Sequence, residues 1–454
     1  MSDNPLAWPS PSSLAPCTDH QREVIAKSFA GPVGILTGGP GTGKTFTVAA
    51  AVREIAEKYG LGAIAAIAPT GKAAVRCTEA FGKLGLKIEA TTIHRFLGVG
   101  RNGHDGNGWG FLHGPDNPVE VKFLIIDEAS MLDTDLASSV FSALRLGTHV
   151  LMVGDPYQLP PVGHGAPLRD MIEVLPSGEL TKIERNSGDI CRVCNEIRSG
   201  KGYRPSIGGA EVTSGRNVRH WETKDALHSI GKLEDLLCSP PASIDPIWDV
   251  QVLCAVNEKS DLSRKAMNKR LQDLLNPSGE RVDGCPFRLG DKVICTSNSL
   301  LPLDSSSELL GCESTLNTFV ANGEIGKVVW LQKKLMKVEF ESPKRTVKVL
   351  MGKPDEENGD SDRNRPRCDF DLAYAITVHK AQGSQSPITI VLIDDSGAAN
   401  QVCSREWHMT AMSRPEKLLI TIGKRHIVDK QSKRVGLRDR QTYLKELLKE
   451  QVAI

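Results

Sequence analysis

The stretch from residue 38 to residue 45 has the residue types and spacing that bind phosphate. It reads Gly-Gly-Pro-Gly-Thr-Gly-Lys-Thr, after an apolar run at 33–36 and before a helix-forming run at 46–52. Glycine lets a backbone wrap closely around an anion, and a helix start offers unpaired N–H groups and a positive dipole end. The Lys44 ammonium can reach the outer phosphates of a nucleotide, and the Thr45 hydroxyl can bind Mg²⁺. A purely structural loop is the alternative. The predicted nucleotide contacts are Gly39, Gly41, Thr42, Gly43, Lys44 and Thr45.

Acidic residues end two further apolar runs. Asp127 and Glu128 follow 121–126, and Asp155 follows 148–154. Hydrolysis of a nucleotide needs a held Mg²⁺ and an oriented water molecule. We expect Asp127 to hold the metal ion and Glu128 to orient or deprotonate the water. An acidic pair at a strand end is common, but downstream of a phosphate loop it indicates a hydrolytic site.

The elements that position these residues alternate between strand and helix. Runs at 33–36, 63–68, 121–126 and 148–153 are short and apolar, and helical patterns separate them. Parallel strands that are buried on both faces have this composition. The alternation predicts a doubly wound parallel sheet, an α/β fold, with its site along the carboxyl ends of the strands.

Residues 98–118 interrupt this alternation. Glycine, asparagine and histidine dominate the stretch, and Trp109 and Phe111 lie within it. The composition predicts a loop or small hairpin that projects from the core.

A second change of pattern begins at about residue 287. Short strands follow one another up to residue 350, and Asn322-Gly323 is a turn signal among them. This predicts a small antiparallel β insert. Residues 353–366 are acidic and indicate a solvated loop, after which the α/β pattern resumes at residue 370.

The composition is that of a soluble, globular protein. The chain has 454 residues, 40% of them hydrophobic, and is too long for one ordinary core, which predicts two or more domains. The formal net charge is +1, so a nucleic-acid surface would be a local groove and not a bulk basic field. No stretch approaches the roughly 20 apolar residues of a membrane span, and the polar start is unlike a signal peptide. We expect a cytoplasmic protein without membrane contact.

The cysteines and the C-terminal basic residues predict no chemistry of their own. The eleven cysteines are scattered, as suits a reducing compartment. Cys191 and Cys194 form a C-x-x-C without a second pair at zinc spacing, so we expect no metal or redox role there. The basic run is expected to be a solvated surface, with a phosphate-contacting face as the alternative. It comprises Lys424, Arg425, Lys430, Lys433, Arg434, Arg438 and Arg440.

Segments spread along the chain resemble the motifs of superfamily 1 helicases. Residues 127–132, Asp-Glu-Ala-Ser-Met-Leu, resemble motif II, and 154–163, Gly-Asp-Pro-Tyr-Gln-Leu-Pro-Pro-Val-Gly, resemble motif III. Motifs Ia, Ib and III are similar to those of the RecD/Dda branch, superfamily 1B, the group that translocates 5′ to 3′. The other matches are 19–21 (the adenine-reading Q motif), 68–74 (Ia), 92–95 (Ib), 180–186 (IV), 375–384 (V) and 409–414 (VI). The resemblance runs in order from about residue 18 to residue 423.

The resemblance implies a fold of two RecA-like P-loop domains with ATP between them. A short 1B hairpin and a small SH3-like β-barrel, 2B, would be inserted into these domains. The implied divisions are a tail (1–17), domain 1A (18–179) with the hairpin at 98–118, the first part of domain 2A (180–284), the 2B insert (285–352), a loop (353–369) and the second part of 2A (370–454).

The resemblance also implies roles in the ATP site. Gln21 would read adenine, and Gln158 would sense the γ-phosphate and couple it to the DNA strand. Arg185 and Arg414 would arrive from the second domain as charge stabilisers, and Gly383 of motif V would line the nucleotide. Guanidinium groups from another domain would make hydrolysis depend on domain closure. The alternative for either arginine is a surface or interface ion pair.

Motifs Ia, Ib and V would contact the DNA strand. Their hydroxyl, ammonium and imidazole groups suit phosphates and sugars. Trp109 or Phe111 would stack on a base as a strand-separating pin, with a small apolar cluster that anchors the loop as the alternative. A satisfied core histidine is the alternative for His94. The implied strand contacts are Pro69, Thr70, Lys72, His94, Thr377 and His379.

Two positions in and beside motif VI depart from the family pattern. Met409 stands where a tyrosine is usual, and Pro415 follows Arg414 where a small residue is more usual. Both departures leave the arginine in place but put the local geometry in doubt. The chain also lacks a long N-terminal extension and an apparent nuclease domain, so it resembles the compact, Dda-sized form.

The function implied by the resemblance is that of an ATP-dependent DNA helicase that moves 5′ to 3′ on single-stranded DNA, as a monomer with ATP and Mg²⁺. The expected partners are single-stranded DNA and single-strand/duplex junctions. A single-strand-binding protein or other replication and repair proteins are further expected partners. A second interpretation is a nucleic-acid-stimulated ATPase or remodeller without independent unwinding, as a subunit of a larger DNA repair complex. An RNA-directed motor is a third, because nothing in the sequence reads a 2′-hydroxyl. A metabolic P-loop kinase is a distant fourth, against which the ordered motifs argue.

Overall fold

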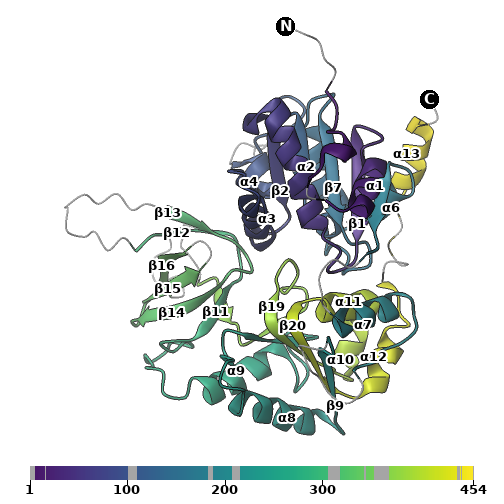
Figure 1. Cartoon of the computed structure of the whole chain (residues 1–454). Coiled ribbons are helices and arrows are strands. Elements are labelled where there is room, and N and C mark those ends of the chain that lie inside the picture. The colour runs from purple at the N-terminus through teal and green to yellow at the C-terminus, as the bar shows by residue number, and fades with distance from the viewer. Residues whose placement is uncertain are drawn as a thin grey trace, which may run out of the picture. The chain divides into compact units, whose positions relative to one another are not determined.

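The chain folds into two compact units (Figure 1). Unit 1 comprises residues 1–217, 403–413 and 428–454, and unit 2 comprises 218–402 and 414–427. The computed structural model describes residues 6–15, 17–100, 110–182, 188–206, 215–304, 317–341, 344–351, 368–436, 440 and 442–452. Four features predicted from the sequence lie outside the described residues, namely Trp109, Arg185, Arg438 and the loop at 353–366.

Unit 1 is built on a parallel sheet of six strands in the order β3-β2-β6-β7-β1-β8. Its central strands are β1 (Val33–Gly38), β6 (Phe123–Ile126) and β7 (His149–Gly154). They are buried along nearly their whole length, as strands covered on both faces are. The outer strands are β2 (Ile64–Ala68), β3 (Thr91–Thr92) and β8 (Ser177–Leu180).

Helices cover both faces of this sheet (Figure 1). Ile35 and Leu36 are neighbours in β1, and both are fully buried, but they belong to different hydrophobic clusters because successive side chains of a strand point to opposite faces. The helices of unit 1 are α1 (Asp19–Ser28), α2 (Lys44–Tyr59), α3 (Gly71–Lys83), α4 (Ile93–Leu97), α5 (Thr134–Ser142), α6 (Pro167–Ile172), α7 (Asp189–Arg198), α11 (Arg405–Met412) and α13 (Leu444–Val452), with 3-10 turns η1 (Pro11–Ser13), η2 (Leu61–Ala63) and η3 (Ala129–Met131).

Unit 2 holds a second parallel sheet, of five strands in the order β18-β10-β19-β20-β9. Leu233 and Met267, from two of its helices, pack with Val252 and Ile390 of the sheet in one cluster. The strands are β9 (Val218–Glu222), β10 (Val250–Cys254), β18 (Ala375–Thr377), β19 (Ser386–Leu392) and β20 (Pro415–Gly423). The helices are α8 (Ala226–Cys238), α9 (Arg264–Leu275) and α10 (Gly397–Val402), while α12 (Arg425–Gln431) runs from unit 2 into unit 1.

An antiparallel sheet is inserted between β10 and β18 of unit 2. Its five strands follow the order β16-β15-β14-β11-β17, and β12 and β13 form a separate pair. Asn322 and Gly323 form the predicted turn, between β13 and β14, and Gly323 has φ +92°. The strands are β11 (Lys292–Cys295), β12 (Ser299–Pro302), β13 (Asn317–Val320), β14 (Ile325–Leu331), β15 (Leu335–Glu341), β16 (Lys344–Leu350) and β17 (Phe370–Leu372).

The predicted fold class is confirmed, since two parallel sheets with flanking helices carry a phosphate loop and an antiparallel insert. The SH3 likeness of the insert and the finer division into domains stay predictions. No helix in the described ranges is both long and apolar enough to cross a membrane. The described cysteines are free thiols, and Cys191 and Cys194 are buried in α7.

Candidate nucleotide and nucleic-acid site

The predicted catalytic residues of unit 1 follow three neighbouring strands. Lys44 comes after β1, Glu128 after β6, and Gln158 after β7, which lies between the other two strands in the sheet. All three strands are parallel, so their carboxyl ends form one continuous edge. The fold therefore gathers a lysine, an acidic pair and a glutamine that lie far apart in the sequence.

The phosphate loop forms a closed turn around its own lysine. Gly41 and Gly43 have φ of +78° and +81°, a region that favours glycine. Lys44 Nζ donates to the carbonyl oxygens of Gly38 at 2.6 Å and Gly39 at 3.1 Å. Because α2 begins at Lys44, its first amides and this ammonium group together offer positive charge to an anion.

Asp127 and Glu128 form a strained acidic pair at the end of β6. Asp127 N donates to Ile67 O at 2.9 Å, and Asp127 Oδ1 accepts from Glu128 N at 3.0 Å. Burial, followed by the neighbouring charge of Glu128, raises the pKa of Asp127 to about 6, against smaller opposing effects of Arg76 and Lys44. Glu128 has φ +51°, a left-handed conformation that non-glycine residues rarely adopt. Strain of this kind is concentrated at functional sites.

The oxygen donors at this edge fit Mg²⁺. Thr45 is in the first turn of α2, and the pKa of Asp127 is raised by burial first and by the neighbouring Glu128 second, so a cation beside this carboxylate would be favourable. Mg²⁺ usually takes one or two carboxylates, and substrate phosphates and water complete its shell. Within the described ranges no group of three or more His, Cys, Asp or Glu forms a cage for a metal ion. The donor set thus suits an ion that arrives with a nucleotide.

Gln158 is held between a buried acid and α11. Asp155, 1% exposed, accepts from Tyr157 N at 3.0 Å and from Gln158 Nε2 at 3.4 Å. Burial raises the pKa of Asp155, and Lys44 is the largest opposing influence. Leu159 N donates to Thr410 Oγ1 at 2.8 Å. The segments that resemble motifs III and VI are therefore in direct contact.

Gln21 has a structural role at the start of α1. Its side-chain oxygen accepts from Thr18 N at 3.0 Å, while Thr18 Oγ1 accepts from Gln21 N at 3.3 Å, which together form a capping box. Gln21 is also buried, at 2% exposed. The amide NH₂ group and the second lone pair of this oxygen are the groups left for a contact with adenine.

Arg414 and Gly383 lie together in unit 2. Arg414 is 5% exposed, and its Nη1 donates at 3.3 Å to the carbonyl oxygen of Ser384, beside Gly383, whose φ is +72°. The two departures from the family pattern are accommodated locally. Met409 is buried in α11, and Pro415 is the first residue of β20, where a missing N–H is best tolerated.

The candidate strand contacts of unit 1 lie at the other end of the same sheet edge. Pro69, Thr70 and Lys72 follow β2, and His94 follows β3, the next strand. Thr70 Oγ1 caps α3 by accepting from Ala73 N at 3.3 Å, so this hydroxyl has a structural partner. The exposed side chain of His94 is not a core histidine.

Phe111 anchors the base of the predicted hairpin. It lies in β5 (Gly110–Phe111), which pairs with β4 (Val99–Gly100). The half-buried Phe111 packs against the cluster that contains Leu97, and its ring centroid is 5.8 Å from that of His94. This contact favours the apolar-anchor interpretation of Phe111 over the base-stacking one.

The candidate strand contacts of unit 2 lie at the end of β18, which is Thr377, and in the turn that follows it, which contains His379. Thr377, 5% exposed, accepts from Lys380 N at 3.4 Å. Burial lowers the pKa of His379 and so favours its neutral form. Burial and then Arg264 lower the pKa of Lys380. The sequence interpretation omitted Arg264 and Lys380, although Lys380 lies within motif V and its charge was visible there.

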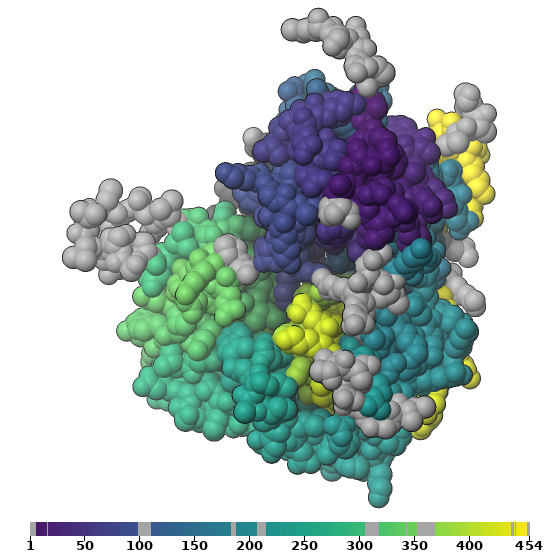
Figure 2. Space-filling model, in the orientation of Figure 1, coloured from purple at the N-terminus to yellow at the C-terminus, as the bar shows by residue number. Residues whose placement is uncertain are grey.

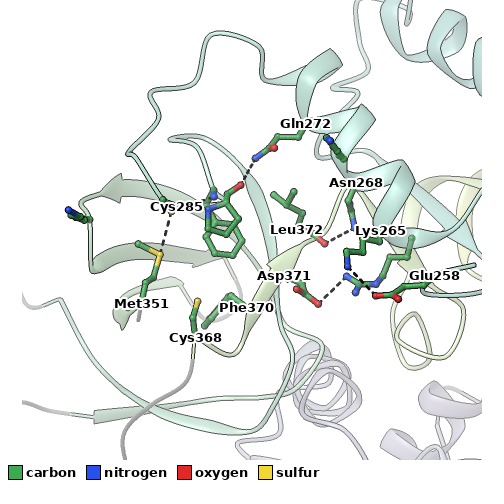
Figure 3. A pocket seen from close by; sticks show the side chains of 16 residues that line it. Glu258, Lys265, Asn268, Gln272, Cys285, Met351, Cys368, Phe370, Asp371 and Leu372 are labelled. Carbon is green, nitrogen blue, oxygen red and sulfur yellow. Dashed lines mark hydrogen bonds and ion pairs between the residues drawn. The ribbon is translucent and has the colours of Figure 1, made fainter. Parts of the chain in front are cut away.

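A pocket of about 980 Å³ lies in unit 2 (Figure 3). Apolar residues such as Phe287 and Phe370 line it, together with the ion pairs Arg264–Asp371 at 3.0 Å and Lys265–Glu258 at 3.2 Å. None of the predicted nucleotide or strand contacts belongs to its lining. We therefore place the candidate nucleotide site at the strand ends of unit 1.

Known proteins are similar to most of this chain. Residues 21–164 match the family model of an AAA domain, and 372–422 match that of a UvrD-like helicase C-terminal domain. The ATP-dependent RecD2 DNA helicase of Deinococcus radiodurans is 30% identical over 92% of this chain, which spans 50% of that relative. The RecBCD enzyme subunit RecD of Mycolicibacterium smegmatis is 26% identical, over 93% of this chain and 74% of the subunit.

A solved structure shares the fold. The Pif1 helicase from Bacteroides, in complex with ADP-AlF3 and single-stranded DNA, superposes with a TM-score of 0.51, at 18% identity and over 96% of each chain. The phosphate loop, the acidic pair, the contact between motifs III and VI, and the RecD2 and RecD relatives agree with one another. The chain is therefore similar over most of its length to RecD-type helicases, and it spans half of the length of the RecD2 relative.

Proposed function

We propose that this protein is an ATP-dependent DNA helicase that moves 5′ to 3′ along single-stranded DNA and unwinds duplex. The observation that carries the proposal is the arrangement of Lys44, Glu128 and Gln158 at adjoining strand ends. This arrangement occurs in a chain that is 30% identical to a protein named as an ATP-dependent DNA helicase.

In the proposed ATP site, residues of this chain bind the phosphates, orient the attacking water and accept its proton. Lys44 exchanges the carbonyl oxygens of Gly38 and Gly39 for phosphate oxygens. Thr45 and Asp127 would hold Mg²⁺, which neutralises charge on the phosphates when it is bound. Glu128 orients the attacking water and accepts its proton.

Further groups complete the proposed site. Gln158 senses the γ-phosphate, and the amide NH₂ of Gln21 addresses adenine. Arg185 and Arg414 stabilise charge on the phosphates, because a guanidinium fork matches phosphate geometry. Backbone that approaches the nucleotide closely is provided by Gly39, Gly41, Thr42, Gly43 and Gly383.

In the proposed strand track, polar groups contact phosphates and sugars, and an aromatic residue separates the strands. Trp109 is the better candidate for the pin, since Phe111 is engaged by the cluster around Leu97. The other proposed contacts are Pro69, Thr70, Lys72, His94, Thr377 and His379.

Unwinding of tailed duplexes tests the proposal. Duplexes with only a 5′ tail or only a 3′ tail are incubated with ATP and Mg²⁺, and strand displacement is followed on native gels. We expect displacement with the 5′ tail alone. A Lys44→Ala variant should lose ATP turnover and displacement together. Displacement with the 3′ tail alone would overturn the polarity, and normal turnover by Lys44→Ala would overturn the site.

A second candidate is an ATPase subunit without independent unwinding. Relatives named as subunits of the RecBCD enzyme favour it. Strand-stimulated ATP turnover without displacement of either substrate would support this second function. Stimulation by RNA but not by DNA strands would instead support an RNA-directed motor.

On the leading proposal the chain acts as a cytoplasmic monomer, with single-strand-binding, replication or repair proteins as partners.

A further inference from the structure

The C-terminal segment, Arg440 and residues 442–452, packs on unit 1 beside the loop that follows Gln158. Its helix α13 lies against α6 (Figure 1), and Figure 2 shows it in yellow on the surface of that unit. Leu444 and Leu448 join the hydrophobic cluster that contains Leu168 of α6. The segment is thus a packed part of the unit that carries the candidate nucleotide site.

Arg440 binds the backbone of that loop. Its Nη1 donates to the carbonyl oxygen of Gly163 and, at 3.2 Å, to that of Gly165. Its own carbonyl oxygen accepts from Arg169 Nη2 at 2.6 Å, and Arg169 pairs with Asp170 at 2.7 Å. Hydrogen bonds from a charged donor are stronger than neutral ones, so this guanidinium holds the loop backbone in place.

A buried carboxylate fixes the segment on α6. Asp170 is 5% exposed and accepts from the hydroxyl of Thr442 as well as from Arg169. A buried carboxylate without such partners would be strongly unfavourable. These contacts therefore hold the chain on both sides of residue 441.

The loop lies close to this segment because it contains glycine. At Gly165, where φ is +74°, a Cβ atom would collide with the Thr134 hydroxyl and would lie 2.9 Å from the Thr442 methyl group. On the opposite side, Thr134 N donates to His164 O at 2.9 Å. The loop is therefore held between the start of α5 and the C-terminal segment.

The chain just before this segment is tied to α11. Gly436 N donates to Glu406 Oε2 at 3.0 Å. Thr410 Oγ1 of the same helix accepts a hydrogen bond from Leu159 N. Helix α11 thus accepts one hydrogen bond from motif III, at Thr410, and one from the C-terminal chain, at Glu406.

We infer that the C-terminal segment positions the 159–166 loop, and that Arg440 is the positioning residue through which the segment acts on Gln158. The inference rests on the proposed function, in which Gln158 senses the γ-phosphate. Gln158 is anchored by Asp155 on its upstream side and by the Leu159–Thr410 hydrogen bond on its downstream side. Arg440 secures the next part of the chain, so that the loop holds Gln158 at a fixed place while ATP turns over.

Two variants of Arg440 and one matched control test this inference on the full chain. In Arg440→Ala we expect the kcat for single-strand-stimulated ATP hydrolysis to fall about tenfold with the KM for ATP within about twofold, because the two charge-assisted hydrogen bonds to Gly163 and Gly165 are lost and no nucleotide contact is removed. Amide hydrogen exchange of residues 162–166 should quicken by about tenfold. Arg440→Lys should restore part of the kcat and part of the protection of the loop from exchange. Lys445→Ala, which removes the ion pair of α13 with Glu173, should leave both unchanged.

The outcomes separate the inference from the proposed function. Faster exchange of the loop with an unchanged kcat would overturn the action on Gln158, and unchanged exchange in Arg440→Ala would overturn the positioning itself. A similar fall of kcat in Lys445→Ala would show a general effect of helix docking and would also overturn it. A wild-type chain without strand-stimulated hydrolysis would defeat the proposed function, while the exchange measurement would still report on Arg440.

Discussion

The Asp127 carboxylate destabilises the folded chain at neutral pH when no cation is bound. Its pKa is raised from 3.8 to about 6 by burial and by Glu128, so the folded state binds protons more tightly than the unfolded state. By linkage, the destabilisation is complete above pH 6 and disappears as the pH falls towards 4. Mg²⁺ bound with nucleotide would remove it by supplying the missing positive charge.

Asp127→Asn should therefore raise the free energy of unfolding by about 1–3 kcal/mol at pH 7.5 in buffer free of metal and nucleotide. The gain should be smaller at pH 5, where the folded wild type is largely protonated at this position. Urea unfolding at both pH values measures the difference. Asp235→Asn, at an exposed position of α8, is the control. Lower stability of Asp127→Asn at pH 7.5 would contradict the electrostatic argument.

Glu128, the proposed base, has a left-handed backbone conformation, with φ +51°. Glu128→Gln keeps the shape of the side chain but cannot accept a proton, so kcat should fall by about 100- to 10,000-fold while ATP still binds. Steady-state hydrolysis and equilibrium binding of a fluorescent ATP analogue measure the two effects. Glu120→Gln, which changes an exposed glutamate paired with Arg145, should hydrolyse ATP normally. An unchanged kcat in Glu128→Gln would remove this residue from the role of base.

At the scale of elements, the site depends on tight turns that follow parallel strands. Three neighbouring strands, β6, β7 and β1, deliver the acidic pair, Gln158 and the phosphate loop to one edge. Gly154, the last residue of β7, shows how close the packing is, because a Cβ atom there would lie 2.8 Å from Leu168 and 3.0 Å from Ser130 N. Small residues at strand ends thus let the loops of the site converge.

Replacement by alanine should change the stability of unit 1 in opposite directions at two glycines. Gly165→Ala should destabilise unit 1 by about 1–3 kcal/mol, because the position has φ +74° and no room for a methyl group beside Thr134. Gly82→Ala should stabilise it by about 0.4–1 kcal/mol, because Gly82 is in α3 and nothing lies within 4 Å of the added atom. Chemical denaturation of both variants tests this, and a stabilising Gly165→Ala would show that the loop is not constrained as described.

At the scale of the whole molecule, the net charge is only +1, so any electrostatic attraction to DNA must come from local groups of basic residues. We propose Lys380 as one such group, because burial and then the charge of Arg264 lower its pKa, which indicates a positive charge without full compensation. Lys380→Ala should weaken binding to single-stranded DNA by about 3- to 10-fold and reduce the slope of log K against log salt by about 0.7. Fluorescence anisotropy over a salt series measures both. Lys265→Ala, which removes a cation paired with Glu258, is the control, and an unchanged slope in Lys380→Ala would exclude a phosphate contact.

Prediction from sequence succeeded where short-range patterns decide the structure. The strand-loop-helix order around Lys44, the strand before Asp127 and the antiparallel insert were all recognisable from glycine spacing and apolar periodicity. The structural roles of Gln21 and Thr70 as helix caps were not predicted, although the Thr18 to Gln21 spacing of a capping box was visible. The proximity of Lys380 to Arg264 was also not predicted, because the two residues are more than 100 positions apart in the sequence.

The sequence by itself determined the fold class, the phosphate loop and the acidic pair, because each depends on residues that are neighbours in the chain. Only the tertiary structure showed that Leu159 meets Thr410 and that Arg440 holds the backbone of Gly163 and Gly165. These contacts join residues that are more than 200 positions apart, and they form because α11 and the C-terminal segment pack into the N-terminal unit. Such packing depends on the complementarity of whole surfaces, which local spacing does not encode.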